Sequence, residues 1–342
     1  MLRRLVRRLF NHLRPMSPAP GRGDRPGPPD DDIRWVLRRR DYPGSRDRVY
    51  LVHRPRGHDP ARPLPLVMVL HGCHEDHEVI RRDTDFNRIA DREGFLVVYP
   101  DITSYAEPRS SDCWGFWLDQ HIHRGGGEVQ DLAEIIREVR REFRVDPDRI
   151  HIAGLSSGAA MAMAALVAHP NLFASGVSTA GVPYSETPTS VSASCSNPGV
   201  FKPLEDVVAA MDAEMGDRKR PVPILVIHST GDCQVHIRAS ERIRDSWGLA
   251  FGVDTTSPAP AVSGVTKGTR WTRSQYADPQ GRTVVETLFV DGLPHGWHGD
   301  RDGKFAFSKA PDTAELAWEF FKVHPLNPDG READRQQPAE VG

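Results

Sequence analysis

The sequence lacks a long hydrophobic run, and it has no excess of basic residues. Its longest apolar stretch, Ala159–Ala168, is only long enough for a buried helix, whereas a membrane-spanning helix needs about 20 apolar residues. The formal net charge of −3 over 342 residues argues against a nucleic-acid-binding protein, because such proteins usually carry a clear basic excess. The composition, 38% hydrophobic and 27% charged, is typical of a globular protein with one domain of about 250–300 residues.

Cysteine is also scarce, and no internal repeat is visible. The four cysteines allow three pairings, among which spacing alone does not choose. Arginine pairs at 3–4 and 7–8 interrupt the continuous apolar core of about 7–15 residues that a secretory signal needs. Reduced thiols and a cytoplasmic or granule-associated location are therefore favoured. An extracellular location stays open, because two of the cysteines lie beside motifs described below.

Both ends of the chain have an unusual composition. Residues 1–14 place apolar side chains at helical spacing with arginines on the other face, which predicts a basic amphipathic helix. Such a helix either associates weakly with a lipid or polymer surface or docks on its own domain. Residues 15–32 are rich in proline and glycine and predict a linker, and residues 325–342 predict a disordered tail.

Short β-type runs alternate with amphipathic helical patterns between residues 33 and 324. Leu66–Leu70 and Phe95–Tyr99 are continuous apolar runs, which are typical of strands buried on both faces. Strands that alternate with helices need crossover connections, so this region predicts one α/β domain with a mostly parallel central sheet flanked by helices. The other expected strands are Val49–Val52, Arg149–Ala153, Ile224–Ile227 and Val284–Val290, and the expected helices are 78–92, 129–139, 159–168 and 310–322.

Two segments rich in serine, threonine, proline and glycine show no periodicity. They are Thr187–Asn197 and Trp247–Gly268. We expect long surface loops there, which serve either as substrate rims or as passive insertions.

The strongest local motif is Gly154-Leu155-Ser156-Ser157-Gly158, which fits the pattern G-x-S-x-G. A nucleophile in this motif sits on a sharp strand-to-helix turn, where side chains on the two glycines would collide with neighbouring backbone. A β-type run precedes the motif and a helical run follows it, as that turn requires. The new helix also directs its first N–H groups toward the place where an oxyanion develops. The motif therefore predicts Ser156 as a nucleophile, with Ser157 as the rival hydroxyl.

A serine hydroxyl needs a base, and fifteen histidines compete for that role. In this type of fold the order along the chain is serine, acid, histidine, each on a loop after a strand. His295 follows the run Val284–Val290 and meets this condition, with His298 as the alternative. Asp232 follows the buried run Ile224–Ile227 and is the expected acid.

An oxyanion hole needs a second N–H donor besides the Ser157 amide. The turn His71-Gly72-Cys73 follows the buried run Leu66–Leu70, at the place where this fold usually supplies that donor. We assign the Cys73 amide to this role, with Gly72 as the fallback.

Several short motifs follow one another in order along the chain. They are LHGC at 70–73, DREGFLVVYP at 91–100, CWGFW at 113–117, GGGE at 125–128, GLSSGAAMA at 154–162, AGVPY at 180–184 and GLPHGW at 292–297. Together they resemble the polyhydroxybutyrate-depolymerase type of esterases, a family that also takes in feruloyl and acetylxylan esterases. The resemblance covers roughly residues 45–322. It implies an α/β-hydrolase fold, no metal or organic cofactor, and a catalytic triad of Ser156, Asp232 and His295.

The resemblance also implies a disulfide framework. In this family the cysteine of the HGC turn pairs with the one of the CW motif, which gives Cys73–Cys113. Cys195–Cys233 remains as the second pair and would brace the loop that holds Asp232. Four free thiols are the alternative from the residues alone.

The sequence departs from the family pattern in places that spare the triad. Ser157 replaces the more usual alanine, HSTGD at 228–232 replaces the commoner HGTAD, and GLPHGW replaces a GxGHAW-like string. We recognise no appended polymer-binding module, which favours soluble oligomers over crystalline polymer. The expected activity is a serine carboxyl-ester hydrolase acting on short hydroxyalkanoate oligomers or related small esters. The alternatives are a feruloyl or acetylxylan esterase, or a peptidase with the same triad.

Aromatic and histidine side chains in these motifs raise two further questions. Trp114, Trp117 and Trp297 either line an apolar acyl or aryl site or belong to ordinary packing. Histidines 71, 74 and 77 do not match common zinc spacings, so no metal site is expected. The expected partner is a small ester or oligoester and not a nucleic acid, and the sequence does not indicate an oligomeric state.

Overall fold

The structure is a computed structural model that describes residues 32–327, except residues 103–104, 106, 110–111, 192–194 and 300. The amphipathic segment expected at 1–14, the linker up to residue 31 and the tail beyond residue 327 lie outside the described residues. Surface association through residues 1–14 therefore stays a prediction. No helix among those described is long and apolar enough to cross a membrane.

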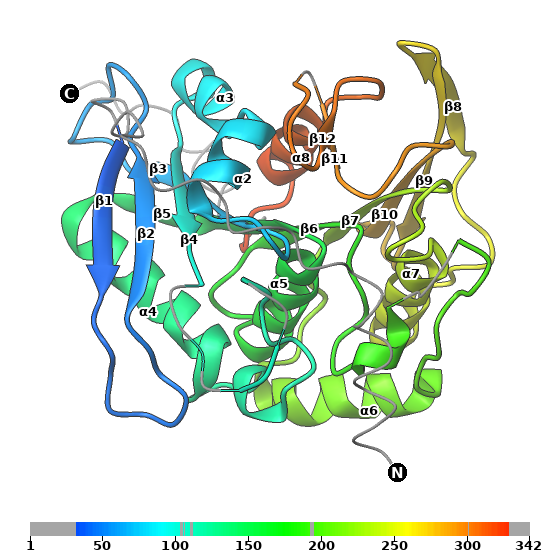
Figure 1. Cartoon of the computed structure of the whole chain (residues 1–342), viewed down its shortest axis with the longest axis horizontal. Helices are drawn as coiled ribbons and strands as arrows, with labels where there is room; N and C mark the ends of the chain where they lie inside the picture. The colour runs from blue at the N-terminus through cyan, green and yellow to red at the C-terminus, as the bar shows by residue number, and fades with distance from the viewer. Residues whose placement is uncertain are drawn as a thin grey trace, which may run out of the picture.

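A ten-stranded sheet forms the centre of the molecule (Figure 1). Its order is β1-β2-β4-β3-β5-β6-β7-β10-β9-β8, and the inner strands from β4 to β10 run parallel. The outer strands on both sides pair antiparallel. The bounds are β1 Asp32–Leu37, β2 Arg48–His53, β3 Leu64–Leu70, β4 Leu96–Pro100, β5 Val145–Leu155, β6 Ser175–Thr179, β7 Ile224–Ser229, β8 Val262–Thr266, β9 Thr269–Ala277 and β10 Thr283–Val290. The predicted α/β class with a mostly parallel sheet is confirmed.

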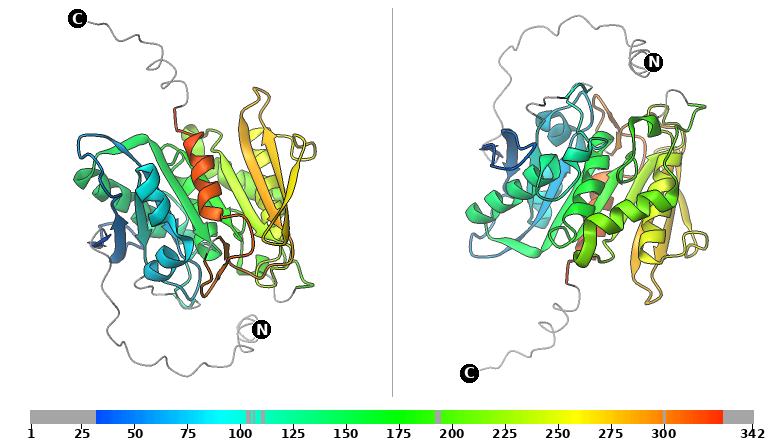
Figure 2. Two further views of the ribbon diagram at one scale, coloured as in Figure 1. Left: turned by 90° about the horizontal axis from the view of Figure 1, so that it is seen from above. Right: turned by 90° about the horizontal axis from the view of Figure 1, so that it is seen from below.

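Helices cover both faces of this sheet (Figures 1 and 2). One layer contains α4, α5, α6 and α7, and the other contains α2, α3 and α8. A small pair of strands, β11 and β12, follows β10. The bounds are α2 His77–Thr84, α3 Phe86–Glu93, α4 Gly127–Glu142, α5 Ser157–Ala168, α6 Leu204–Met215, α7 Arg238–Phe251, α8 Thr313–Lys322, β11 Trp297–His298 and β12 Ala306–Phe307.

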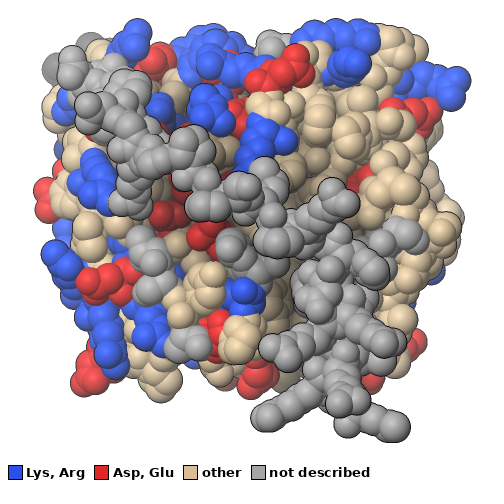
Figure 3. Space-filling view, viewed as in Figure 1, with Lys and Arg blue, Asp and Glu red and all other residues tan. Residues whose placement is uncertain are grey.

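Each helix layer buries apolar side chains against the sheet. All residues of α5 are buried, in keeping with its alanine- and methionine-rich sequence without a polar face. On the other face, Phe95 and Trp318 stack with ring centroids 4.0 Å apart, which docks α8 beside α3. Ion pairs from Arg88 and Arg92 to Glu315 close the same contact at the surface. Figure 3 shows basic and acidic side chains along the upper rim of the molecule, where this helix layer lies in Figure 1.

The helix expected at 78–92 is divided into two. Asp76 caps α2 by accepting the Val79 amide, and the chain turns at Asp85, whose φ is 59°. This left-handed residue ends α2 and redirects the chain into α3. The periodicity of the two short helices is continuous in sequence, so the break is invisible to pattern analysis.

The expected loop Trp247–Gly268 is wrong over much of its length. Its first part is the end of α7, in which Ile243, Trp247 and Ala250 face the core. Its last part contains β8, an edge strand whose exposed valines carry no alternating pattern. The other expected loop, Thr187–Asn197, contains a single 3-10 turn and is otherwise irregular where it is described.

Several helices and strands were not predicted, because their sequences show only a weak hydrophobic pattern. Strand β6 reads Ser-Gly-Val-Ser-Thr and has a single large apolar residue. The strand packs closely on α5: a Cβ on Gly176 would lie 2.5 Å from the side chain of Leu166, which would have to move. The other unexpected helices and strands include β1, β9, α6, α7, β8 and the short pair β11 and β12.

Leu132 tests the packing of the α4 layer, because its side chain is fully buried. Replacement Leu132→Ala leaves a cavity under the helix and should lower the free energy of unfolding by about 2–5 kcal/mol. The control is Leu249→Ala on α7, whose leucine is 51% exposed. Urea denaturation measures both, and equal effects of the two substitutions would contradict the assignment of α4 to the core.

Candidate active site

Ser156 lies on a strained turn between β5 and α5. Its backbone has φ 56° and ψ −119°, a conformation that residues other than glycine rarely adopt. The Ser156 amide donates to the carbonyl of Thr179 at 2.9 Å, and its carbonyl accepts the Ala160 amide at 3.0 Å. These bonds to β6 and to the first turn of α5 hold the serine at the apex of the turn.

The two glycines of the motif are required by close backbone approach. A Cβ on Gly154 would lie 2.4 Å from the carbonyl carbon of Gly158. A Cβ on Gly158 would lie 2.3 Å from the carbonyl oxygen of His71. The turn after β3 is therefore packed directly against the serine turn. The rival hydroxyl of Ser157 is buried and makes no hydrogen bond to another described residue.

Asp232 and His295 come together although they are 63 positions apart. Asp232 follows β7 and His295 follows β10, and their Oδ2 and Nδ1 atoms are 2.6 Å apart. Both side chains are buried. Because β5, β7 and β10 are parallel, this pair and the Ser156 turn lie at the same carboxyl edge of the sheet.

The carboxylate of Asp232 is stabilised by several donors. Its Oδ1 accepts the amides of Gln234 and Val235 at 2.8 and 2.9 Å. Burial alone would raise the pKa of Asp232, but hydrogen bonds from His228 and His295 outweigh it and hold that pKa well below its usual range. The acid is therefore ionised at any pH near neutrality.

His298 does not take the position expected for the base. It lies buried in β11, whereas Asp232 pairs with His295. Burial lowers the pKa of His298 to about 4, so its imidazole is neutral at neutral pH.

In the turn after β3, the polar groups next to the Cys73 amide are hydrogen-bonded to other residues. The Gly72 amide donates to Glu75 Oε2 at 2.7 Å, and the Gly72 carbonyl accepts His71 Nδ1 at 2.8 Å. The His71 carbonyl accepts the indole N–H of Trp114 at 3.0 Å. The Cys73 amide makes no hydrogen bond to another described residue. The fallback donor, Gly72, is thus engaged with Glu75, whereas no hydrogen bond from the Cys73 amide is seen among the described residues.

Glu75 was missed by the sequence analysis. Its side chain is buried, and this burial raises its pKa even though the Gly72 amide hydrogen bond acts in the opposite direction. A carboxyl group three positions after a glycine gives no distinctive pattern, so only the three-dimensional turn reveals the contact.

All four cysteines are in disulfides. Cys73–Cys113 joins the turn after β3 to the CW motif, and Cys195–Cys233 joins an irregular loop to the residue after Asp232. These are the pairs that the family resemblance implies. The default expectation of reduced thiols is therefore wrong, and a cytoplasmic location loses its support.

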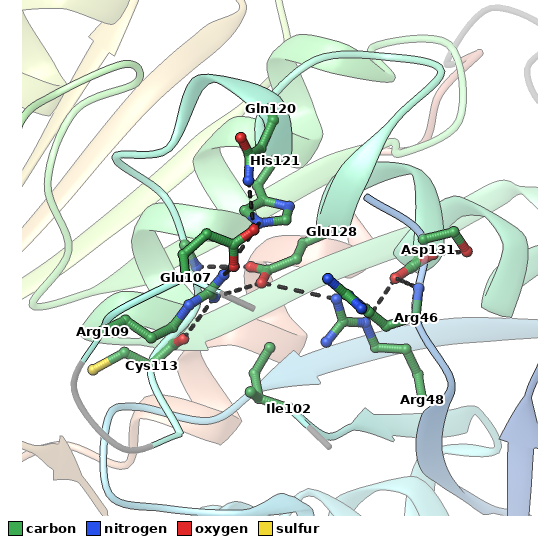
Figure 4. A network of polar contacts seen from close by, with 12 residues as sticks. Arg46, Arg48, Ile102, Glu107, Arg109, Cys113, Gln120, His121, Glu128 and Asp131 are labelled. Carbon is green, nitrogen blue, oxygen red and sulfur yellow. Dashed lines mark hydrogen bonds and ion pairs between the residues drawn. The ribbon is translucent and has the colours of Figure 1, made fainter. Parts of the chain in front are cut away.

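A buried polar network holds the CW motif in place (Figure 4). Glu128, in the first turn of α4, accepts the Gly115 amide at 2.7 Å and Arg109 Nη1 at 2.5 Å. Arg109 also donates to the carbonyl of Cys113 at 3.1 Å. The loop that carries one end of the disulfide is thereby anchored to α4.

Arg48 extends this network to β2. Its side chain is fully buried and lies 2.8 Å from Asp131 and 3.8 Å from Glu128. Burial alone would raise the pKa of Glu128, but the positive charges of Arg48 and its other neighbours lower it. Two carboxylates and two guanidinium groups thus compensate one another inside the domain.

Two of the three tryptophans that were expected to line a substrate site lie inside the core. Trp114 and Trp297 are fully buried, and Trp297 packs on Phe86 with ring centroids 5.8 Å apart. Their expected role in an acyl site is corrected, because a side chain enclosed by the core presents no surface to a ligand. Trp117 is half-buried and packs edge-on against Phe116.

Histidines 71 and 77 both contact Asp101, at 3.4 and 3.0 Å. Within the described ranges, no group of three or more histidine, cysteine or carboxylate side chains is arranged to hold a metal.

Residues 49–257 match the family described as esterase PHB depolymerase. The chain belongs to this esterase family. The matched region includes Ser156 and Asp232, and His295 follows it along the chain.

Members of related esterase groups are similar to this chain at low identity. Acetylxylan esterase A of Aspergillus oryzae is 24% identical over 70% of this chain and 78% of its own length. Poly(3-hydroxyalkanoate) depolymerase C of Paucimonas lemoignei is 29% identical over 68% of this chain. The alignment covers 55% of that longer protein.

Solved structures agree on the fold. An acetyl xylan esterase from Aspergillus awamori gives a TM-score of 0.60 at 18% identity, covering 80% of this chain and 94% of its own. A feruloyl esterase module from Clostridium thermocellum gives 0.51 at 12% identity, covering 87% of this chain and 86% of its own. The fold of this PHB depolymerase-type esterase is the α/β-hydrolase fold.

Arg48 tests the buried network. Arg48→Met keeps much of the side-chain volume but leaves Asp131 and Glu128 buried without this cation, which should cost about 3–5 kcal/mol of folding free energy. Arg38→Met, which removes an exposed ion pair with Asp47, should leave the urea midpoint nearly unchanged. A midpoint for Arg48→Met equal to that of the control would refute the proposed structural role.

Proposed function

We propose that this esterase cleaves small carboxyl esters, including short hydroxyalkanoate oligomers, through Ser156, His295 and Asp232. The observation that supports the proposal is the contact between His295 Nδ1 and Asp232 Oδ2 at the edge of the sheet where the strained Ser156 turn also lies. A histidine oriented in this way presents Nε2 as the base.

In the first step, His295 takes the proton of the Ser156 hydroxyl while its oxygen attacks the ester carbonyl. The negative charge that develops on the carbonyl oxygen is held by the amides of Ser157 and Cys73. His295 then gives the proton to the alcohol oxygen as the bond to carbon breaks. The acyl group stays on Ser156.

In the second step, water repeats the sequence. His295 takes a proton from water, the oxygen attacks the acyl carbon, and the proton returns to Ser156 as the acid leaves. Asp232 holds the imidazole in the tautomer with hydrogen on Nδ1 and stabilises the charged ring. No step calls on a cofactor.

The substrate class rests on the relatives rather than on a recognised pocket. A poly(3-hydroxyalkanoate) depolymerase and acetylxylan esterases are similar to this chain. We place short hydroxyalkanoate esters first, because the family that the chain matches is described as esterase PHB depolymerase. A feruloyl or acetylxylan ester is the second candidate, because solved esterases of those names share the fold.

We further propose that the enzyme acts in an oxidising compartment. Both disulfides lie beside groups assigned to the mechanism, since Cys73 supplies an amide and Cys233 follows Asp232. Disulfides persist in secreted and periplasmic proteins and are rare in the cytosol.

Ser156→Ala tests the nucleophile. The substitution removes the only hydroxyl that the mechanism acylates, and we expect kcat for p-nitrophenyl acetate to fall roughly ten-thousandfold or more. Ser178→Ala is the control, because Ser178 is a buried serine outside the proposed mechanism and its hydroxyl has no hydrogen-bond partner among the described residues. A fluorophosphonate should add mass to Ser156 in the wild type and not in Ser156→Ala, and labelling elsewhere would refute the assignment.

A substrate panel on the wild type tests the specificity. We expect the highest kcat/KM on short p-nitrophenyl esters and hydroxybutyrate oligomers, compared with methyl ferulate, acetylated xylan and a peptide p-nitroanilide. A preference for methyl ferulate or acetylated xylan would select the second candidate. Cleavage of the anilide ahead of all esters would make the protein a peptidase.

A further inference from the structure

His228, near the end of β7, is a second histidine on the carboxylate of Asp232. Its side chain is fully buried, and its Nε2 lies 3.1 Å from Asp232 Oδ2. His295 approaches the same oxygen from its own loop at 2.6 Å. The reaction described above gives His228 no task, although it contacts the acid directly.

The hydrogen positions on His228 follow from its other partners. Its Nε2 also lies 2.8 Å from the carbonyl oxygen of Val235, which only accepts hydrogen bonds. Nε2 must therefore carry a hydrogen, shared between Val235 and Asp232. Nδ1 lies 2.6 Å from the hydroxyl of Ser240 on α7. With both nitrogens held, the ring stays directed at the carboxylate.

This arrangement weakens Asp232 as a hydrogen-bond acceptor for His295. The carboxylate accepts two amides on Oδ1 and two imidazoles on Oδ2. A donor on Oδ2 withdraws negative charge from the oxygen that holds His295. It also fixes the position of that oxygen.

We propose that His228 is a positioning residue that fixes the carboxylate of Asp232 and limits how strongly it holds a proton on His295. This inference rests on the proposed triad. The base must accept a proton from Ser156 and release it to the leaving alcohol within one cycle. A carboxylate without a competing donor would keep His295 protonated, and thus inactive as a base, up to a higher pH.

His298 is a further titratable group close to this cluster. His298 interacts electrostatically with His228, Asp232 and His295, but burial lowers its pKa to about 4 and it carries no charge in the pH range of the test. Cys233, the neighbour of Asp232, is in a disulfide and does not titrate.

The test is the pH profile of kcat/KM on p-nitrophenyl acetate for His228→Leu. Loss of the donor should move the acidic limb to higher pH by roughly half a unit to one unit, the size expected for one hydrogen bond. At the pH optimum kcat should fall by roughly tenfold, because the carboxylate is less well fixed, while KM stays within about twofold. His228→Gln places an amide N–H near the same position and should return the limb most of the way to the wild-type pH.

His53→Gln is the matched control. His53 on β2 is also a buried histidine between carboxylates, Asp32 at 2.6 Å and Asp91 at 2.9 Å, and it takes no part in the proposed mechanism. This variant should lose stability without moving the limb. A general effect of losing a buried histidine would move both profiles alike and would overturn the proposal.

An acidic limb in His228→Leu equal to that of the wild type would also overturn it. If His228→Leu does not fold, Ser240→Ala decides, because it frees Nδ1 and should shift the limb by a smaller amount in the same direction. An unshifted limb there counts against His228. A wild type inactive on all esters, or an active Ser156→Ala, would instead reject the proposed function itself.

Discussion

The backbone of Ser156 imposes the constraint on which the rest of this structure depends. A serine at φ 56° and ψ −119° costs roughly 1–3 kcal/mol and persists only where the surroundings fix it. Here the surroundings are the backbone bonds to Thr179 and Ala160 and the contact of Gly158 with the turn after β3. The parallel sheet brings these segments to one edge, so the strained turn and its support come from the same architecture.

Long-range anchors then fix the loops that complete this edge. The turn after β3 is held by Glu75, by the indole of Trp114 and by the Cys73–Cys113 disulfide. The CW motif on the other side of that disulfide is held in turn by Arg109 and Glu128. Catalytic amides must be in place before charge develops, because reorganisation during the reaction would consume the electrostatic gain. The buried charges serve this rigidity, because the cost of removing them from water offsets much of their attraction and leaves little net stability.

The sequence predicted a site residue correctly in type and place where a polar residue had to stand on a turn directly after a strand. Ser156, Asp232 and His295 each follow a recognisable strand-forming run. The structure places these runs in the parallel part of one sheet, as β5, β7 and β10, with β6 between the first two. Strand β6 and the break at Asp85 could not be found in this way, because close packing against α5 and a single left-handed residue leave no periodic signal. The contacts of Glu75 and His228 exist only in the folded chain. The place of His228 directly after the buried run Ile224–Ile227 is the one sequence signal that could have indicated its position near Asp232.

Helix α5 has no face that could meet water, since all of its residues are buried between the sheet and neighbouring helices. Its place in the fold therefore depends mostly on tertiary packing, because its alanine and methionine side chains are buried only when the sheet and the neighbouring helices are assembled. The serine turn is formed by the junction of this helix with β5. The geometry of the serine turn therefore depends on the packing of α5, and a local opening around this helix would remove the turn even where the rest of the sheet stays folded.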